Sequence, residues 1–231
     1  MSDTRTTPTD HDLLKQARAI HDRILVLDSH IDFEPEDLTG ERNYTQRGET
    51  QFNLPNMIDG GLDALFFVIY VGQTREAQNP DAFKAAGYQR AYQAAVEKFD
   101  AVHRFTSEIA RQQMGLALSA ADIRRIHANG EKAALMGVEN GYPLGEDLPR
   151  VQEFYQRGAR YISLTHNGHN QLGDSHTGER DGWKWHGVSP LGKQVIAEMN
   201  RLGIMVDVSH ASKEAMMQTA ALSKAPVIAS H

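Results

Sequence analysis

The chain has 231 residues, of which 40% are hydrophobic and 23% charged, and its formal net charge is −6. This balance is typical of a globular protein with one large or two small domains. The sequence has no basic tract, which argues against nucleic acid or an anionic membrane as a partner. It also has no cysteine, so disulfides and thiolate zinc sites are excluded, and a bound metal would need His, Asp and Glu ligands.

The first ten residues differ in character from the rest of the chain. Residues 1–10 are polar and predict a disordered N-terminus, whereas residues 11–231 predict a single domain. No secretory signal is visible, and the longest apolar run, Ala64 to Val71, is too short to cross a bilayer. We therefore expect a cytoplasmic protein without a membrane segment, although a signal missing from this sequence stays an open alternative.

A helical pattern starting near Asp10 leads into the first predicted strand. The apolar run of this strand, Ile24 to Leu27, is followed directly by polar residues that include His30 and Asp32. If the strand continues through them, these two side chains share a face, because side chains two apart in a strand point the same way. An imidazole beside a carboxylate is half of a plausible zinc site, but a surface turn is the commoner explanation of the pair taken alone.

Strands and helices then alternate to the end of the chain. Further apolar runs predict strands at residues 64–71, 133–139, 161–166, 204–210 and 226–231. Helical patterns with cap signals occupy residues 53–61, 79–113, 119–130, 148–158, 189–203 and 212–223. Strict alternation implies a parallel sheet, and no glycine-rich phosphate loop follows the first strand. We therefore predict an α/β fold of the (β/α)8 TIM-barrel type, truncated after about six strand–helix units.

Ionisable residues gather at the predicted strand ends. They are His30, Asp32, Glu139, His166, His210 and His231. Each one taken alone is better explained as a turn residue, a cap or a half-buried histidine. Together they favour a site, because the carboxyl ends of parallel strands meet at one rim. This donor set suits two zinc ions that share a carboxylate and a hydroxide.

The polar loop of residues 167–187 carries further candidates. We interpret His169, His176 and His186 as solvated residues or as residues that support the metal ligands. Trp183 and Trp185 either line a pocket or anchor the loop, and the sequence leaves both open.

In its motifs the chain resembles the membrane (renal-type) dipeptidases, a branch of the binuclear metal amidohydrolase barrels. The resemblance covers nearly the whole chain from about Ile24. Its markers, taken in order, are Asp28-Ser29-His30-Ile31-Asp32, Gly137-Val138-Glu139-Asn140-Gly141, Leu164-Thr165-His166-Asn167, the segment Leu202 to His210, and the segment Ala225 to His231.

The resemblance implies an activity and roles for the residues. His30 and Asp32 would bind one zinc ion, His210 and His231 would bind the other, and Glu139 would bridge both. His166 would bind the substrate and stabilise charge on the scissile carbonyl oxygen. The reaction would be hydrolysis of a dipeptide, its C-terminal residue in some cases of D configuration, by a metal-bridging hydroxide.

Members of that family continue past the residue that corresponds to His231. Their continuation supplies an arginine for the substrate carboxylate and an aspartate that handles the proton of the leaving amine. We therefore expect this 231-residue chain to be a fragment that, expressed alone, is poorly soluble or inactive. The alternatives are an amidohydrolase acting on N-acyl amino acids or cyclic amides, and a catalytically silent metal-binding protein. A homodimer is left open.

Overall fold

The structure is a computed structural model that describes residues 9–74, 76 and 78–231. Strands and helices alternate along it, as predicted. The strands are β1 (Leu27–Ile31), β2 (Ala64–Tyr70), β3 (Met114–Leu116), β4 (Lys132–Glu139), β5 (Ala159–Ser163) and β6 (Met205–Asp207). The α-helices are α1 (Asp10–His21), α2 (Leu54–Gly60), α3 (Ala85–Arg104), α4 (Ala120–Ala128), α5 (Pro149–Arg157), α6 (Pro190–Leu202) and α7 (Lys213–Leu222). Shorter helical turns are Pro35–Asp37, Pro80–Phe83, Phe105–Ile109, Tyr142–Leu144 and Glu179–Asp181.

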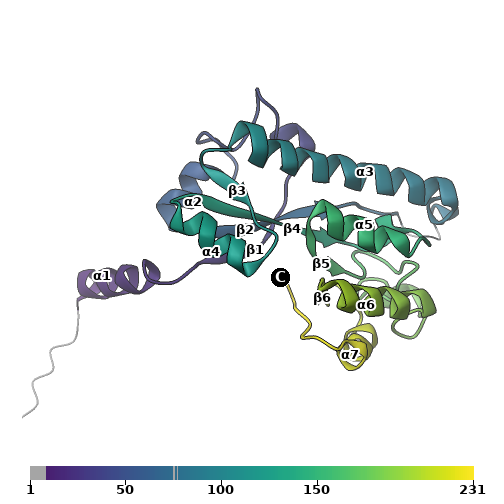
Figure 1. The fold of residues 1–231 in the computed structure, drawn as a ribbon. Helices are drawn as coiled ribbons and strands as arrows, with labels where there is room; N and C mark the ends of the chain where they lie inside the picture. The colour runs from purple at the N-terminus through teal and green to yellow at the C-terminus, as the bar shows by residue number, and fades with distance from the viewer. Residues whose placement is uncertain (1–8, 75, 77) are drawn as a thin grey trace, which may run out of the picture.

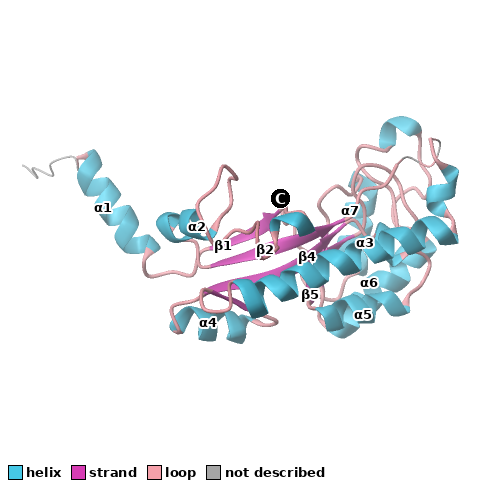
Figure 2. Ribbon diagram, turned by 90° about the horizontal axis from the view of Figure 1, so that it is seen from above, coloured by secondary structure: helices cyan, strands magenta, loops and turns pink. Residues whose placement is uncertain are grey.

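The six strands form one parallel sheet in the order β1-β2-β4-β5-β6. One edge of β4 pairs with β2 from Ala133 to Glu139. The other edge is shared, with β3 on Lys132 to Ala134 and β5 from Met136 onwards. Helix α3 packs on β2, α5 on β5 and α6 on β6, so helices cover one side of the sheet (Figures 1 and 2). The result is a parallel half-barrel with outer helices, which confirms the predicted fold class.

Both faces of the central strands are buried, which explains their continuous apolar sequences. In β2, Phe67 and Ile69 pack into the large cluster beneath the helices, whereas Phe66 points to the concave face and packs with Tyr161 and Leu135. Alternation along β4 places Glu139 on the concave face with Leu135, because side chains two apart share a face. The strand therefore delivers a carboxylate to the inner rim of the half-barrel.

The helix boundaries follow their cap residues. The Ser189 side chain accepts a hydrogen bond from the Gly192 backbone N–H, and Pro190 occupies the first turn of α6. Helix α6 ends at Gly203, which adopts the left-handed φ of 82°. Helix α5 ends in the same way at Gly158, with φ of 112°. These ends lie where the sequence predicted them, so each helix returns the chain to the start of the next strand.

Three predicted elements differ from the structure. The short strand β3 was missed, because it begins just after residues 79–113, which the sequence predicted as one long helix and which the structure divides into the turn Pro80–Phe83, α3 and the π-helical turn Phe105–Ile109. Residues 226–231 form no regular strand, since their pairing is a single parallel bridge from Ile228 to Asp207. The first strand begins at Leu27 rather than ending there, so His30 belongs to the strand itself.

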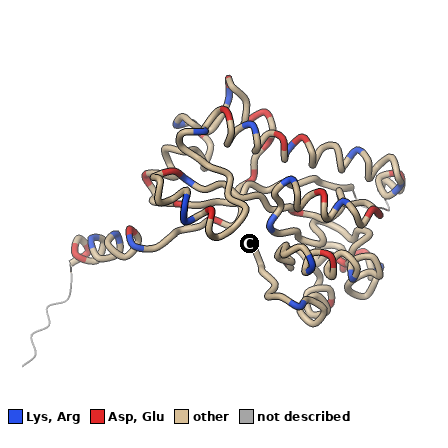
Figure 3. The backbone as a smooth tube through the Cα atoms, in the orientation of Figure 1, with Lys and Arg blue, Asp and Glu red and all other residues tan. Residues whose placement is uncertain are grey.

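Helix α1 stands away from the sheet (Figure 1). Thr9 caps it in a reciprocal pair with Asp12, and its apolar residues Leu13, Leu14 and Ile20 are all exposed. Residues 1–8 of the predicted disordered N-terminus lie outside the described residues. Basic and acidic residues are interspersed along the helices (Figure 3). Among the described residues, no helix has the length and apolar character required to cross a membrane.

Candidate metal centre

The structure brings all six of the predicted strand-end residues to one cavity of about 510 Å³. Glu139 ends β4, His30 lies in β1, and the other four follow strands or the bridge at Ile228. The lining residues are His30, Asp32, Glu34, Tyr70, Lys98, Glu139, His166, His210 and His231. Segments far apart in the sequence therefore converge because the carboxyl ends of parallel strands share one rim.

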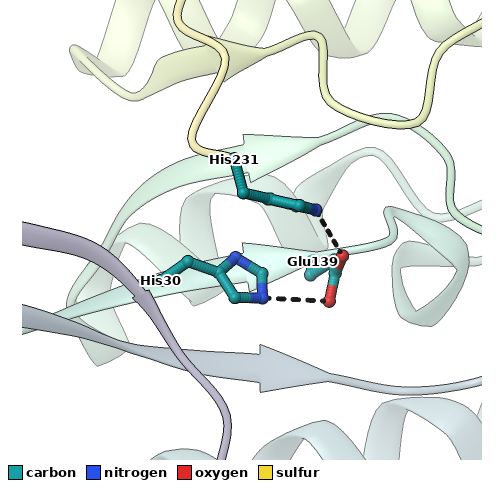
Figure 4. Close-up of side chains that lie close together, drawn as sticks. All are labelled: His30, Glu139 and His231. Carbon is teal, nitrogen blue, oxygen red and sulfur yellow. Dashed lines mark ion pairs between the residues drawn. The ribbon is translucent and has the colours of Figure 1, made fainter.

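Glu139 lies at the centre of this cluster, and its side chain is only 5% exposed. Its Oε2 atom lies 3.6 Å from His30 Nε2, whereas its Oε1 atom lies 3.3 Å from His231 Nε2 (Figure 4). The same Oε1 lies 2.9 Å from His210 Nε2 and 3.5 Å from His166 Nε2. The two carboxylate oxygens therefore face different sets of imidazoles.

These separations fit metal coordination. Zinc ligands about 2.0–2.1 Å from the ion in a tetrahedron lie about 3.3 Å from one another. Two overlapping groups have ligand atoms within 4.8 Å of one another, namely His30 with Glu139 and His231, and Glu139 with His166 and His210. Glu139 belongs to both groups, as expected of a carboxylate between two ions. The donor set of imidazole and carboxylate suits a divalent metal of the zinc type.

Two further contacts link the groups. His210 Nε2 lies 2.8 Å from His231 Nε2, which is close enough for both atoms to contact a single ion. Asp32 Oδ1 lies 3.7 Å from His30 Nε2, but the Asp32 side chain is 73% exposed, although Asp32 lines the cavity. Asp32 is therefore near the cluster without being part of its compact centre.

The charges in the cavity favour an ionised Glu139. Burial acts to raise the pKa of Glu139. The hydrogen bond with His210 and the charges of His166 and His30 together outweigh burial, so the pKa of Glu139 is lowered. For His30, burial acts to lower the pKa, whereas Asp32 and Glu139 raise it, and the net shift is upward. The hydrogen bond from His30 lowers the pKa of Asp32. The carboxylates thus keep the negative charge that a cation requires.

His166 has a different environment from the other histidines. Its Nδ1 atom lies 3.3 Å from the Tyr70 hydroxyl, and its ring packs against the Tyr70 ring. Burial lowers the pKa of His166, so the neutral imidazole is favoured. Burial, followed by the nearby charge of Glu139, raises the pKa of Tyr70 and keeps its phenol protonated. A phenol that donates to Nδ1 would leave Nε2–H facing the cavity as a donor.

The loop between β5 and α6 holds the histidines that follow β5 and β6. The buried Asp174 carboxylate accepts backbone N–H groups of Lys184, Trp185 and Gly187 at 2.9–3.2 Å. The adjacent Ser175 hydroxyl donates to the His166 carbonyl. The next backbone N–H, that of His176, donates to the His210 carbonyl at 3.0 Å.

That last contact stabilises an unusual backbone. His210 adopts a left-handed φ of 63°, which costs a non-glycine residue about 1–2 kcal/mol. Its carbonyl also accepts the Thr165 hydroxyl at 3.3 Å. These contacts hold the His210 backbone in the conformation from which its ring reaches the cavity.

The sequence left open whether Trp183 and Trp185 line a pocket or anchor the loop, and the structure gives them different positions. Trp185 Nε1 donates to the Asn170 carbonyl at 2.7 Å, so Trp185 anchors the loop. Trp183 is 42% exposed and lines a separate surface hollow with His169. His176 supports His210, and His169 contacts Asp174 at 3.1 Å.

Sequence reasoning missed several residues in and around the cavity, among them Glu34, Tyr70, Lys98 and Asp174. Tyr70 ends β2 at the same rim and could have been found by the strand-end rule. Lys98 reaches the cavity from α3, where it donates to the Phe33 carbonyl at 2.8 Å. Its position in a helical pattern carried no signal of this. The supporting role of Asp174 depends on the loop conformation, which the sequence did not predict.

The chain is similar in sequence and in fold to known dipeptidases. Residues 14–231 match the model of the membrane dipeptidase family, peptidase family M19. Dipeptidase tcpJ of Claviceps purpurea is 34% identical over 179 residues, which are 78% of this chain and 41% of that protein. The crystal structure of the probable dipeptidase PvdM from Pseudomonas aeruginosa superposes with a TM-score of 0.83 at 29% identity, covering 96% of this chain and 56% of that one.

A third match carries a ligand. A metallopeptidase from Rhodobacter sphaeroides, solved with a phosphinate mimic of the dipeptide L-Ala-D-Ala, superposes with a TM-score of 0.73 at 26% identity. The match covers 90% of this chain and 65% of that one. The chain thus spans about half the length of the relatives it matches. The family implies a metal cofactor, and the chain's own His and Glu clusters are able to hold one. The chain belongs to the membrane dipeptidase family, peptidase family M19.

Proposed function

We propose that this chain forms the binuclear zinc centre of a dipeptidase, with Glu139 as the bridging ligand. The observation that carries the proposal is the position of the Glu139 carboxylate. Its two oxygens face His30 on one side and His210 and His231 on the other, at 2.9–3.6 Å. A buried carboxylate with imidazoles at both oxygens is the arrangement that a shared ligand requires.

His30 and Asp32 would hold the first ion, and His210 and His231 the second. The 3.7 Å distance between His30 Nε2 and Asp32 Oδ1 supports the first pair. The 2.8 Å separation of the His210 and His231 Nε2 atoms supports the second. His231 also lies close to His30, with ring centroids 4.0 Å apart, so the two ions would be near neighbours.

When bound, zinc supplies a water-derived nucleophile near neutral pH and polarises the scissile carbonyl. The chain's own residues would position the substrate around that chemistry. His166, with Tyr70 at Nδ1, would donate from Nε2 to the carbonyl oxygen as negative charge develops on it. Glu139 stays ionised because its pKa is lowered, so it serves as a ligand rather than as a proton donor.

The proposed substrate is a dipeptide, including dipeptides with a D residue at the C-terminal position. Two observations support this class. The curated relatives are named dipeptidases, and the Rhodobacter sphaeroides relative binds a mimic of L-Ala-D-Ala. The cavity of about 510 Å³ has room for a ligand of that size.

The test combines metal analysis with a substrate panel on the full chain. We expect two zinc ions per chain by elemental analysis, and any turnover to favour dipeptides over N-acyl amino acids and cyclic amides. Preference for either of those classes would contradict the proposed substrate. Bound zinc with no turnover of any class, both by this chain and by a form extended to the length of its relatives, would support the catalytically silent alternative. Mass measurement in solution decides whether the chain is a homodimer, which stays a prediction.

A further inference from the structure

A buried chain of hydrogen bonds links Asp207, Ser230 and His231. The Ser230 hydroxyl donates to Asp207 Oδ2 at 2.6 Å, and the Ser230 Oγ lies 2.9 Å from His231 Nδ1. Asp207 is 1% exposed and Ser230 is 8% exposed. The other carboxylate oxygen, Oδ1, accepts the backbone N–H groups of Ser209 at 2.9 Å and Ser230 at 3.2 Å.

The lengths of these bonds fix the direction of the protons. An O···O distance of about 2.5–2.7 Å is typical of a hydroxyl that donates to a carboxylate. A serine hydroxyl has one proton, and here that proton lies on the Asp207 side. The Ser230 Oγ therefore has lone pairs alone to offer to His231, and His231 must donate its Nδ1 proton. The neutral ring then carries no proton on Nε2, the nitrogen that faces Glu139 and His210.

We infer that Asp207 is a positioning residue that holds His231, through Ser230, in the tautomer whose Nε2 binds metal. This inference rests on the proposed function, in which His231 is a ligand. Ligand histidines commonly donate their second ring N–H to a carboxylate, which fixes the tautomer and the ring orientation. Here a serine hydroxyl lies between the carboxylate and the ring. His30 and His210 lack such support, because in the described part of the chain their buried Nδ1 atoms have no hydrogen-bond partner.

One substitution should reverse the donors and acceptors along these hydrogen bonds while keeping the size of the side chain at position 207. In Asp207→Asn, the two backbone N–H groups at Oδ1 would keep the amide oxygen on their side. The amide NH2 would then face Ser230 and donate to its Oγ. The Ser230 proton would turn towards His231 Nδ1, and the ring proton would move to Nε2, where it competes with the metal.

The first measurement is the His231 tautomer in the metal-free full chain, read from ¹⁵N chemical shifts of the imidazole at about pH 8, where histidines are neutral. We expect Nδ1–H in the parent chain and Nε2–H in Asp207→Asn. The second measurement is zinc titration by calorimetry. We expect affinity at one of the two sites to fall by about 10- to 100-fold, the range seen when supporting partners of ligands are lost.

Two matched variants distinguish the effect of the Asp207–Ser230–His231 hydrogen bonds from a general loss of structure. Ser230→Thr keeps a hydroxyl and should retain the parent tautomer and the parent zinc affinity. Ser209→Ala removes a neighbouring hydroxyl 3.3 Å from Ser230 Oγ and should also retain the Nδ1–H tautomer. If Asp207→Asn does not fold, Ser230→Ala provides the test, and we expect it to lose the single tautomer and to weaken zinc binding.

An Nε2–H tautomer in the parent chain would overturn the inference. The same holds for an unchanged tautomer or an unchanged zinc affinity in a folded Asp207→Asn. Failure of the proposed function has a different signature, since a parent chain that binds no zinc would overturn the metal centre itself. The tautomer comparison needs no metal, so it would still decide whether Asp207 orients His231.

Discussion

His210 and His231 follow different segments of the chain, yet their Nε2 atoms lie 2.8 Å apart. Two neutral imidazole nitrogens at this distance both present lone pairs unless one carries a proton or a cation lies between them. Both rings also lie within 3.3 Å of Glu139 Oε1. The pair and Glu139 Oε1 therefore surround a point in the cavity where a cation would be stabilised.

Replacing His210 should remove one metal and spare the other. In His210→Ala, Glu139 and His30 remain in place on the opposite side, so we expect one tight zinc site and a second site weakened by at least about 10-fold. Calorimetric titration measures both affinities. His186→Ala is the control, because His186 lies in the neighbouring loop and belongs to neither metal-binding group. Equal weakening of both sites in His210→Ala would contradict separate ligand sets.

Metal affinity should fall on acidification because of the histidines. Asp32 and Glu139 outweigh burial and raise the pKa of His30, so protons compete for this ring from somewhat above the ordinary histidine pKa of about 6.5. Glu139 stays ionised in that range because its pKa is lowered. The apparent zinc affinity measured against pH should therefore decline through the histidine range. In the metal-free chain, Asp32→Asn should lower the His30 pKa measured by NMR, and an unchanged value would contradict this reading.

On the concave face of the sheet, any side chain at position 137 should clash with Tyr161 and destabilise the fold. A Cβ atom there would lie 2.0 Å from the Tyr161 ring, which is fully buried and donates its hydroxyl to the Ser29 carbonyl. Gly137→Ala should therefore destabilise the fold by about 1–3 kcal/mol or more, measured by urea unfolding. Gly40→Ala serves as the control, because no atom lies within 4 Å of its added Cβ. Equal stability of the two variants would show that Tyr161 does not pack on Gly137.

The loop that supports His210 should depend on Asp174. Asp174→Ala would leave the backbone N–H groups of Lys184, Trp185 and Gly187 without their acceptor. Since a hydrogen bond to a charged group contributes about 1.5–3 kcal/mol, we expect a loss of about 3 kcal/mol. Hydrogen exchange at those three amides should accelerate. Asp147→Ala is a matched surface control, because Asp147 is 53% exposed and pairs with Arg150 at 3.5 Å. Unchanged exchange in Asp174→Ala would contradict the anchoring role.

The regular elements could be predicted because their signals are local. The caps at Ser189 and Gly203 bound α6, and the apolar run from Ala64 defines β2. The strand β3 could not be found this way, since three residues are too few to show a periodicity. Residues 226–231 have strand composition, but a strand also requires a neighbour along its length, and here a single bridge forms.

The candidate site shows the same division. The strand-end rule led to His30 and Glu139, because parallel strands bring their carboxyl ends together whatever lies between them. The bond from Ser230 to Asp207 joins residues 23 positions apart, and no pattern in the sequence encodes its length or direction. Geometry of this kind determines which imidazole nitrogen is free, and it appears only once the side chains are placed.

The most direct test of the account is the zinc content and affinity of Glu139→Gln beside the parent chain. The amide has the size of the carboxylate but lacks its charge, and it cannot offer two anionic oxygens to two ions. If Glu139 bridges the ions, the parent chain binds two zinc ions and the variant shows weakened affinity at both sites together. Loss of one zinc ion with the other bound as tightly as in the parent would contradict the bridging role.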